Sequence, residues 1–188
     1  MKRIQLPLSE ETIMELHAGE QVLLSGILYT GRDAAHKRLI QMIENHQELP
    51  FDIENQTIYY VGPTPCKDNE IFGSGGPTTS GRMDAYTPTL LDLGLKGMIG
   101  KGKRSVSVKE SIRRNHCVYF GAIGGAGAYI KQCIKSCEVI AFDDLGPEAI
   151  RKLEVKDFPV TVIIDAYGND WYSQGRREYL KGKNYASQ

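Results

Sequence analysis

Apolar residues gather in short runs that alternate with stretches of helical periodicity along the chain. The run at residues 21–30 is almost continuously apolar, which is typical of a strand buried on both faces. Within that run, Gly26 indicates a bulge or a close approach of another part of the chain. Further strands are predicted at residues 50–54, 57–61, 98–100, 117–123, 138–142 and 158–165.

Helices are predicted between these strands. Residues 34–45 carry apolar side chains at helical spacing, and Ser9 is a helix cap followed by two acidic residues, so a helix should begin there and end near Gly19. Shorter helices are predicted at residues 89–93, 106–114, 124–133 and 147–153. Strands alternating with helices indicate an α/β fold, a layered domain, and no linker divides residues 1–188, so we expect a single domain.

Charge and composition argue against several classes of partner. The chain has 23 Lys and Arg against 23 Asp and Glu, so no overall field favours nucleic acid or an anionic membrane. No apolar run approaches the roughly 20 residues that cross a bilayer. The first residues lack the apolar core of a signal peptide, so we expect a cytoplasmic protein that binds neither nucleic acid nor membrane.

The four cysteines do not form a recognisable metal motif. No Cys-x-x-Cys pair is present, and nothing indicates a secreted disulfide scaffold. Cys133 and Cys137 are four residues apart, on one helix face or at a helix end, but they lack further ligands. We interpret the cysteines, which are Cys66, Cys117, Cys133 and Cys137, as small hydrophobic side chains.

Residues 73–84 hold the densest candidate chemistry, with four glycines, four hydroxyls, one proline and one arginine. Pro77 suits the first position of a helix, and a helix beginning there would direct free N–H groups and its positive dipole end at an anion. Thr78 and Arg82 are four apart and would share a helix face. The alternative is a glycine-rich turn whose hydroxyls cap a helix; a Walker loop does not fit, because no Gly-Lys-Ser/Thr follows.

Two other junctions can meet the same anion. Arg32 lies where the first long strand passes into a helix, and such junctions carry ligands in α/β proteins. The basic residues 101–105 follow the strand at 98–100, so a lysine there can reach the anion or belong to a solvated charge run. His36, in the first turn of the helix after Arg32, is interpreted as structural. A further glycine-rich junction at residues 124–128 lacks the dinucleotide-binding spacing.

The motif Gly-Pro-Thr-Thr-Ser-Gly-Arg-Met-Asp at residues 76–84 resembles the signature of a family of iron–sulfur hydro-lyases, the class I fumarases and L-tartrate dehydratases. It resembles their β subunit, which is the C-terminal domain in single-chain members. Further blocks that are similar follow in family order, namely Arg32-Asp33-Ala34-Ala35-His36, Gly62-Pro63-Thr64-Pro65, Gly100-Lys101-Gly102, Gly124-Gly125-Ala126-Gly127-Ala128 and Asp165-Ala166-Tyr167-Gly168-Asn169.

The resemblance implies a fold, a reaction and a partner. The fold would be of the swivelling β/β/α type, and the reaction a reversible hydration of fumarate to malate or, second, the dehydration of tartrate to oxaloacetate. A 4Fe-4S cluster would be held by three cysteines of the partner α subunit, where an iron holds and removes the substrate hydroxyl as a Lewis acid. This chain would then hold no metal and would act within a hetero-oligomer.

The resemblance also implies roles for particular residues. Arg32, Gly76, Arg82 and Lys101 would bind the dicarboxylate, with Lys101 selected over Lys103. Thr78 would be the proton-transfer residue, and Lys101 would share in catalysis. Because an unperturbed threonine is a poor base, nearby cations would have to stabilise its alkoxide.

Two hypotheses from other classes compete with this one. A stand-alone anion- or nucleotide-binding module is supported by the glycine-rich loops. A structural subunit with a decayed site would have lost Arg32, Thr78 or Arg82, and all three are present.

Overall fold

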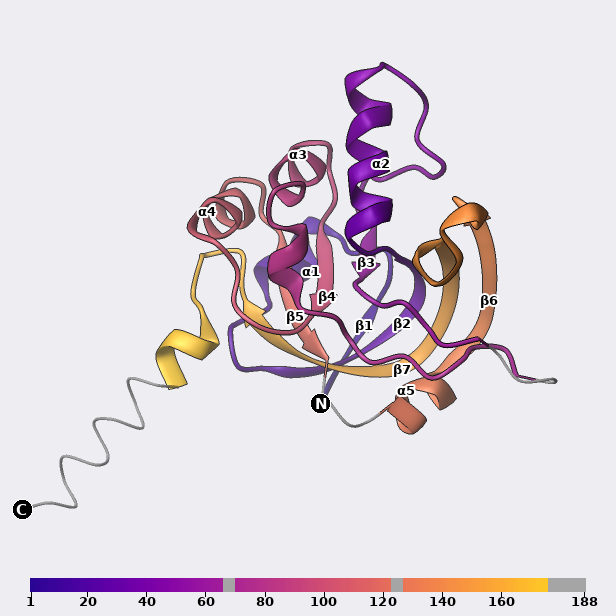
Figure 1. The fold of residues 1–188 in the computed structure, drawn as a ribbon. Coiled ribbons are helices and arrows are strands. Elements are labelled where there is room, and N and C mark those ends of the chain that lie inside the picture. The colour runs from indigo at the N-terminus through magenta and orange to yellow at the C-terminus, as the bar shows by residue number, and fades with distance from the viewer. Residues whose placement is uncertain (66–69, 123–126, 176–188) are drawn as a thin grey trace, which may run out of the picture.

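The computed structural model describes residues 1–65, 70–122 and 127–175, and its elements are shown in Figure 1. The strands are β1 Lys2–Gln5, β2 Gln21–Thr30, β3 Thr57–Tyr59, β4 Gly97–Gly100, β5 Val118–Ala122, β6 Ile134–Ala141 and β7 Ile150–Ile164. The α-helices are α1 Glu10–Met14, α2 Asp33–Glu44, α3 Thr87–Asp92, α4 Val106–Arg114 and α5 Gly127–Cys133. Two segments are 3-10 helices, η1 Ser80–Met83 and η2 Asp143–Glu148.

Five strands close into a barrel. The strands β2, β3, β4 and β5 pair in parallel, and the long strand β7 pairs antiparallel with both β5 and β2. The remaining two strands extend this sheet, β1 beside β2 and β6 beside β7. The expected α/β class is confirmed, with a sheet that closes on itself, whereas the layered swivelling β/β/α type and the single domain over residues 1–188 stay predictions.

The barrel wall separates two hydrophobic clusters. Side chains alternate across a strand, so Tyr59, Ile99 and Phe120 belong to the cluster inside the barrel. Their neighbours Met98 and Tyr119 join the second cluster, which the helices α2, α3 and α4 cover from outside. Figure 1 shows these three helices above the strands and α5 below them. Burial on both faces explains why these strands are almost continuously apolar.

The barrel closes through a bulge that the sequence predicted. The pairing of β2 with β7 shifts register between Leu24 and Gly26. Gly26 has a φ of 122° in the left-handed region, and an added Cβ would lie 2.6 Å from the Leu6 carbonyl oxygen. Both the bulge and the close approach expected at Gly26 are therefore confirmed.

Several predicted elements are wrong for local reasons. Residues 50–54 form a turn instead of a strand, because the Asp52 side chain accepts a hydrogen bond from the Glu54 N–H and Asn55 has a φ of 62°. The expected helix at residues 147–153 is the end of η2 followed by β7, which begins at Ile150. The helix expected at residues 89–93 is α3, which begins earlier, at Thr87, with Pro88 in its first turn.

Two further boundaries differ from expectation. The helix α1 ends at Met14, well before Gly19. Cys133 ends α5, whereas Cys137 lies on β6, so the two thiols do not share a helix. In the part of the chain that the structure describes, no helix is both long and apolar enough to span a bilayer.

His36 lies wholly inside the second cluster. Its Nδ1 lies 2.8 Å from the carbonyl oxygen of Arg32, to which it donates as the neutral ring, and its ring packs edge-on against Tyr60. Burial lowers the pKa of His36 to about 4 and outweighs that hydrogen bond, which favours the charged form. The imidazole is therefore neutral in the folded protein at pH 7, in keeping with a structural role.

This burial predicts a pH dependence of stability. Because the folded pKa lies below the unfolded value of about 6.5, the contribution of His36 is present above pH 6.5 and lost as the pH falls towards 4. We expect the stability advantage of the wild type over His36→Asn to shrink by about 3 kcal/mol between pH 7 and pH 4. Urea unfolding of both proteins across this range measures it, and a constant difference would show that His36 titrates normally.

Candidate active site

The carboxyl ends of the parallel strands meet at one end of the barrel. One row of paired residues crosses it, formed by Thr30, Tyr59, Ile99 and Phe120. Arg32 lies two positions beyond this row, after the end of β2, and Lys101 lies two positions beyond it, after the end of β4. At this level the end of β3 and the segment of residues 78–80 lie between Arg32 and Lys101. Because neighbouring strands are about 4.8 Å apart, the two main chains are roughly 14 Å from each other.

The glycine-rich motif is inserted between two of these strand ends. The Thr78 N–H donates to the Tyr60 carbonyl oxygen at 2.7 Å, and the Ser80 N–H donates to that of Lys101 at 2.9 Å. Thr79 forms a parallel β-bridge with Lys101. The segment therefore continues the sheet where β3 and β4 separate.

This arrangement corrects the helix expected from Pro77. Residues 77–79 are extended, and the single 3-10 turn η1 begins at Ser80, with Thr79 as its cap. The Thr78 N–H is consumed by the sheet, so it cannot form the predicted N–H anion site. The helical spacing that was to set Thr78 beside Arg82 is also absent, and what remains available is the half-buried hydroxyl of Thr78.

The Arg32 guanidinium forms an ion pair with Glu148, a residue that the sequence analysis did not single out. Its Nη2 lies 3.2 Å from Glu148 and 3.6 Å from Asp33, and its side chain is 23% exposed. An added Cβ at Gly62 would lie 3.0 Å from the Arg32 Cδ, so a larger residue there would push the Arg32 side chain aside. The Nε of Arg32 is buried without a hydrogen-bond partner among the described residues. A buried N–H left unpaired is costly, which marks it as a donor available to a ligand.

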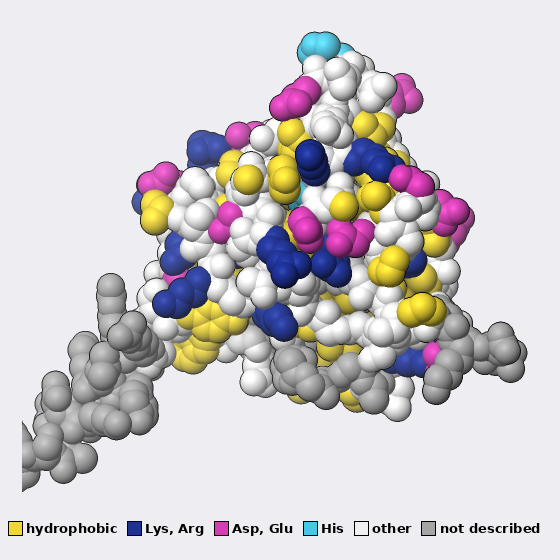
Figure 2. Space-filling model, viewed as in Figure 1, with side chains coloured by type: hydrophobic (Ala, Val, Ile, Leu, Met, Phe, Trp, Pro, Cys, Tyr) yellow, Lys and Arg dark blue, Asp and Glu magenta, His cyan; other side chains and the backbone are white. Residues whose placement is uncertain are grey.

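The other predicted cations are exposed. Arg82 lies in η1 and Lys101 directly after β4, and neither forms an ion pair with a described residue. Gly76 is exposed as well, with nothing within 4 Å of an added Cβ. Figure 2 shows Lys and Arg side chains gathered with Asp and Glu side chains near the middle of the face below α2 and α3.

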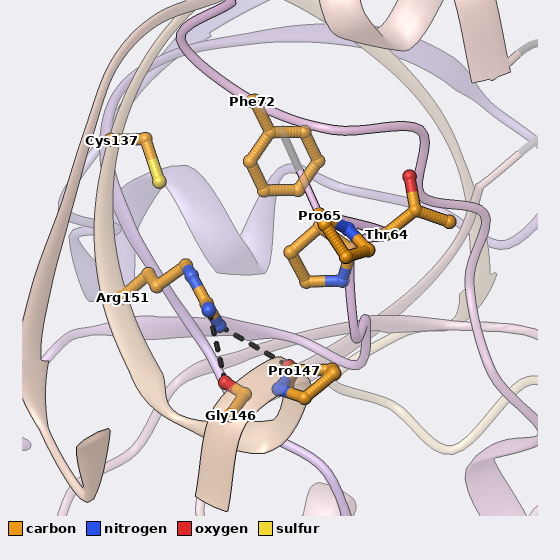
Figure 3. A pocket seen from close by; sticks show the side chains of 8 residues that line it. Thr64, Pro65, Phe72, Cys137, Gly146, Pro147 and Arg151 are labelled. Atoms are coloured by element: carbon orange, nitrogen blue, oxygen red, sulfur yellow. Dashed lines mark hydrogen bonds between the residues drawn. The ribbon is translucent and has the colours of Figure 1, made fainter. Parts of the chain in front are cut away.

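A cavity of about 260 Å³ lies beyond the loop that follows Gly62, and it contains none of the predicted site residues. Figure 3 shows Arg151 in this cavity pointing toward the carbonyl oxygens of Gly146 and Pro147, which it binds at 3.0 and 3.2 Å. The lining is otherwise mostly apolar, with Pro65 and Phe72. The cavity is therefore separate from the residues that the sequence predicted for the anion site.

The described cysteines do not resemble cluster ligands. Burial raises the pKa of Cys117 to about 12, and its thiol donates to the Leu95 carbonyl oxygen. Burial also raises the pKa of Cys133. Among residues 1–65, 70–122 and 127–175, no three His, Cys, Asp or Glu side chains lie together as a metal site. Cys66 and most of the glycine-rich junction at 124–128 lie outside the described residues.

Comparison with known proteins now identifies the family. The model of the fumarase C-terminus family matches residues 1–175. The chain belongs to this family of hydro-lyase domains. It is 39% identical over 176 residues to the aerobic class I fumarate hydratase of Escherichia coli strain K12, a match covering 93% of the chain and 31% of that enzyme. It is 37% identical over 166 residues to fumarate hydratase 2 of Leishmania major, covering 87% and 29%.

A third relative has a different length. The chain is 33% identical over 183 residues to a putative L(+)-tartrate dehydratase subunit beta of Methanocaldococcus jannaschii, and the match covers 94% of both proteins. The chain therefore spans about a third of the fumarate hydratases but nearly all of this separate β subunit. Members of the fumarase C-terminus family thus occur both within longer chains and as short ones.

The structure adds site residues that the sequence reasoning missed. Glu148 binds Arg32 and also accepts the Ala34 N–H at the start of α2, although 114 residues separate Glu148 from Ala34. Ser80 and Tyr119 are buried and contact the loop of Lys101. No local motif marks Glu148 or Tyr119, since each acts across strands that meet only in the folded barrel.

We expect Glu148→Ala to lower the free energy of unfolding by about 1 to 2 kcal/mol, because it removes a helix N-terminal acceptor and the partner of Arg32. Asp144→Ala is the matched control, since Asp144 binds Arg38 between the same η2 and α2 but on the exposed surface. That change should cost less than about 0.5 kcal/mol. Urea unfolding compares the two, and equal losses would mean that Glu148 is an ordinary surface carboxylate.

Proposed function

We propose that this chain is the β subunit of an iron–sulfur hydro-lyase that reversibly hydrates fumarate to malate. The observation that carries the proposal is the joining of Arg32, Lys101 and the segment of Thr78 and Arg82 at one barrel end, with the Arg32 Nε buried and unpaired. The fumarate hydratases among its relatives support the substrate.

The geometry suits a dicarboxylate. A guanidinium binds both oxygens of a carboxylate at once, and Arg32 and Arg82 reach the site from separate loops. Lys101 supplies a third charge from the segment that pairs with the motif on its far side from Arg32, and the exposed Gly76 leaves room for the ligand. In the proposed mechanism these groups hold the dianion and stabilise the charge that builds on a carboxylate as the neighbouring carbon exchanges its proton.

The proton is assigned to the hydroxyl of Thr78. Thr79 is its neighbour in an extended segment, so their side chains point to opposite sides. Ser80 is wholly buried and uses its hydroxyl in bonds to Lys101 and Tyr119. Choosing Thr78 over Thr79 follows the family resemblance, and the nearby cations Arg82 and Lys101 would favour a negative oxygen there.

The cluster belongs, in this proposal, to a partner α subunit. The described residues of this chain do not fit as its ligands, since they contain no group of metal-binding side chains. Two thirds of the length of the fumarate hydratase relatives lies outside the match, whereas the separate tartrate dehydratase β subunit matches throughout. We therefore infer a hetero-oligomer in which the α chain corresponds to the unmatched part.

Tartrate dehydration is the second candidate, favoured by one observation. The relative that corresponds to this chain along nearly its whole length is named for L(+)-tartrate. Both reactions need a clamped four-carbon dicarboxylate and a proton carrier, so the residues above serve either. We rank fumarate first because the Escherichia coli class I fumarate hydratase has the higher identity, 39% against 33%.

Reconstitution tests the function directly. We expect the full chain, combined anaerobically with a partner that carries the cluster, to convert fumarate to malate, because the clamp and the cluster are then together. The chain without its partner should show no turnover. Malate formation and tartrate consumption are followed side by side. A stoichiometric cluster and turnover on this chain by itself would contradict the two-subunit assignment.

Thr78→Val tests the proton carrier, since valine keeps the shape and removes the hydroxyl. We expect kcat of the complex to fall by about a hundredfold or more, with KM little changed and with exchange of the substrate's carbon-bound hydrogen falling in step. Thr79→Val is the matched control and should retain most activity. If Thr79→Val abolishes turnover and Thr78→Val does not, the carrier is Thr79.

A further inference from the structure

Three hydrogen bonds connect the motif that carries Thr78 and Arg82 to the loop of Lys101. The Lys101 N–H donates to Ser80 Oγ at 3.1 Å, Ser80 Oγ lies 2.9 Å from Tyr119 Oη, and Tyr119 donates to the Gly102 carbonyl oxygen at 3.0 Å. Because the amide can only donate and the carbonyl can only accept, the Ser80 hydroxyl must donate to Tyr119. We call this directed chain the hydroxyl bridge.

The hydroxyl bridge is enclosed by the protein. Ser80 and Tyr119 are both fully buried, and burial raises the pKa of Tyr119, so its hydroxyl stays protonated and can donate. Gly100, at the end of β4, leaves space for the Ser80 hydroxyl, since an added Cβ at Gly100 would lie 2.0 Å from Ser80 Oγ. Loss of one hydroxyl would leave its neighbours buried and unpaired, which is more costly than the bond itself.

A second contact joins the same two segments further along. The buried guanidinium of Arg104 binds Asp84 at 2.6 Å, and Asp84 also accepts the Ser105 N–H at 2.6 Å. Arg104 lies over the Tyr119 ring, 5.0 Å from its centroid. The loop after β4 is therefore fixed at both ends, and Lys101 lies at the end that the hydroxyl bridge holds.

We propose that Ser80 and Tyr119 are positioning residues that fix the main chain of Lys101 and so direct its ammonium group to the substrate. The inference rests on the proposed function, in which Lys101 binds the dicarboxylate. Neither hydroxyl is exposed, so both act through Lys101 and neither reaches a ligand. The competing role is a purely structural one, in which the bridge stabilises the fold without affecting Lys101.

A double-mutant cycle separates the two roles in the assembled complex. We expect Tyr119→Phe to lower kcat/KM by about tenfold, or 1.4 kcal/mol. In a Lys101→Met background the same change should have less than about a twofold effect, because the group being positioned is gone. If Tyr119→Phe lowers kcat/KM by the same factor in the Lys101→Met background as in the wild type, the proposal is overturned. Ser80→Ala repeats the cycle and covers the case in which Tyr119→Phe fails to fold.

Hydrogen exchange tests the bridge without any turnover. In the full chain, we expect the Lys101 amide to exchange about tenfold faster or more in Tyr119→Phe and Ser80→Ala, because its acceptor loosens or is lost. Thr57→Val is the matched control, since the Thr57 hydroxyl is buried without a hydrogen-bond partner among the described residues. It should leave Lys101 unchanged.

The two measurements distinguish the two proposals. An unchanged Lys101 amide in both bridge variants would overturn the positioning role, whatever the enzyme catalyses. Faster exchange in a complex that neither hydrates fumarate nor dehydrates tartrate would overturn the proposed function, while the bridge would still be shown to hold the Lys101 main chain.

Discussion

The antiparallel pairing of β7 with β2 is the constraint on which the rest of the structure depends. The strand β7 runs from Ile150 to Ile164 and is long enough to pair with β5, β6 and β2. Its pairing with both β2 and β5 closes the parallel strands β2, β3, β4 and β5 into a barrel. Closure fixes the curvature of the wall and thereby the spacing of the strand ends. Closure thereby brings the segments after β2 and β4, which carry Arg32 and Lys101, to the same end of the barrel.

The polar groups at this barrel end are arranged so that the main chain is satisfied before any ligand arrives. The motif uses the N–H groups of Thr78 and Ser80 on the Tyr60 and Lys101 carbonyls, and Glu148 accepts the Ala34 N–H at the start of α2. In the proposed function these N–H groups take no part in binding the anion, in contrast to phosphate loops, where main-chain N–H groups bind it. A planar carboxylate is well matched by guanidinium groups, and the unpaired Nε of Arg32 is the clearest vacancy for one.

Local patterns predicted β2 and α4 with their observed bounds. Such elements are decided within a few residues, as the continuous apolar run of β2 and the hydrogen bond of the Ser105 side chain to the Val108 N–H at the start of α4 show. Local patterns placed Arg32 at a strand end for the same reason. The helix expected at Pro77 was wrong because its N–H groups find acceptors on two distant strands, which no window of sequence contains. The sequence analysis also missed Glu148, because its partners Arg32 and Ala34 are remote in the sequence and become its neighbours only in the folded protein.

The contact between Gly100 and Ser80 has a consequence for how this protein can change over time. An added Cβ at Gly100 would overlap the Ser80 oxygen, at 2.0 Å, so any larger residue at 100 is excluded while serine is present. Removing the serine hydroxyl first would leave the Tyr119 hydroxyl and the Lys101 amide unmatched. A larger residue at position 100 therefore requires a change at Ser80 as well, and a protein with the Ser80 change alone would be less stable.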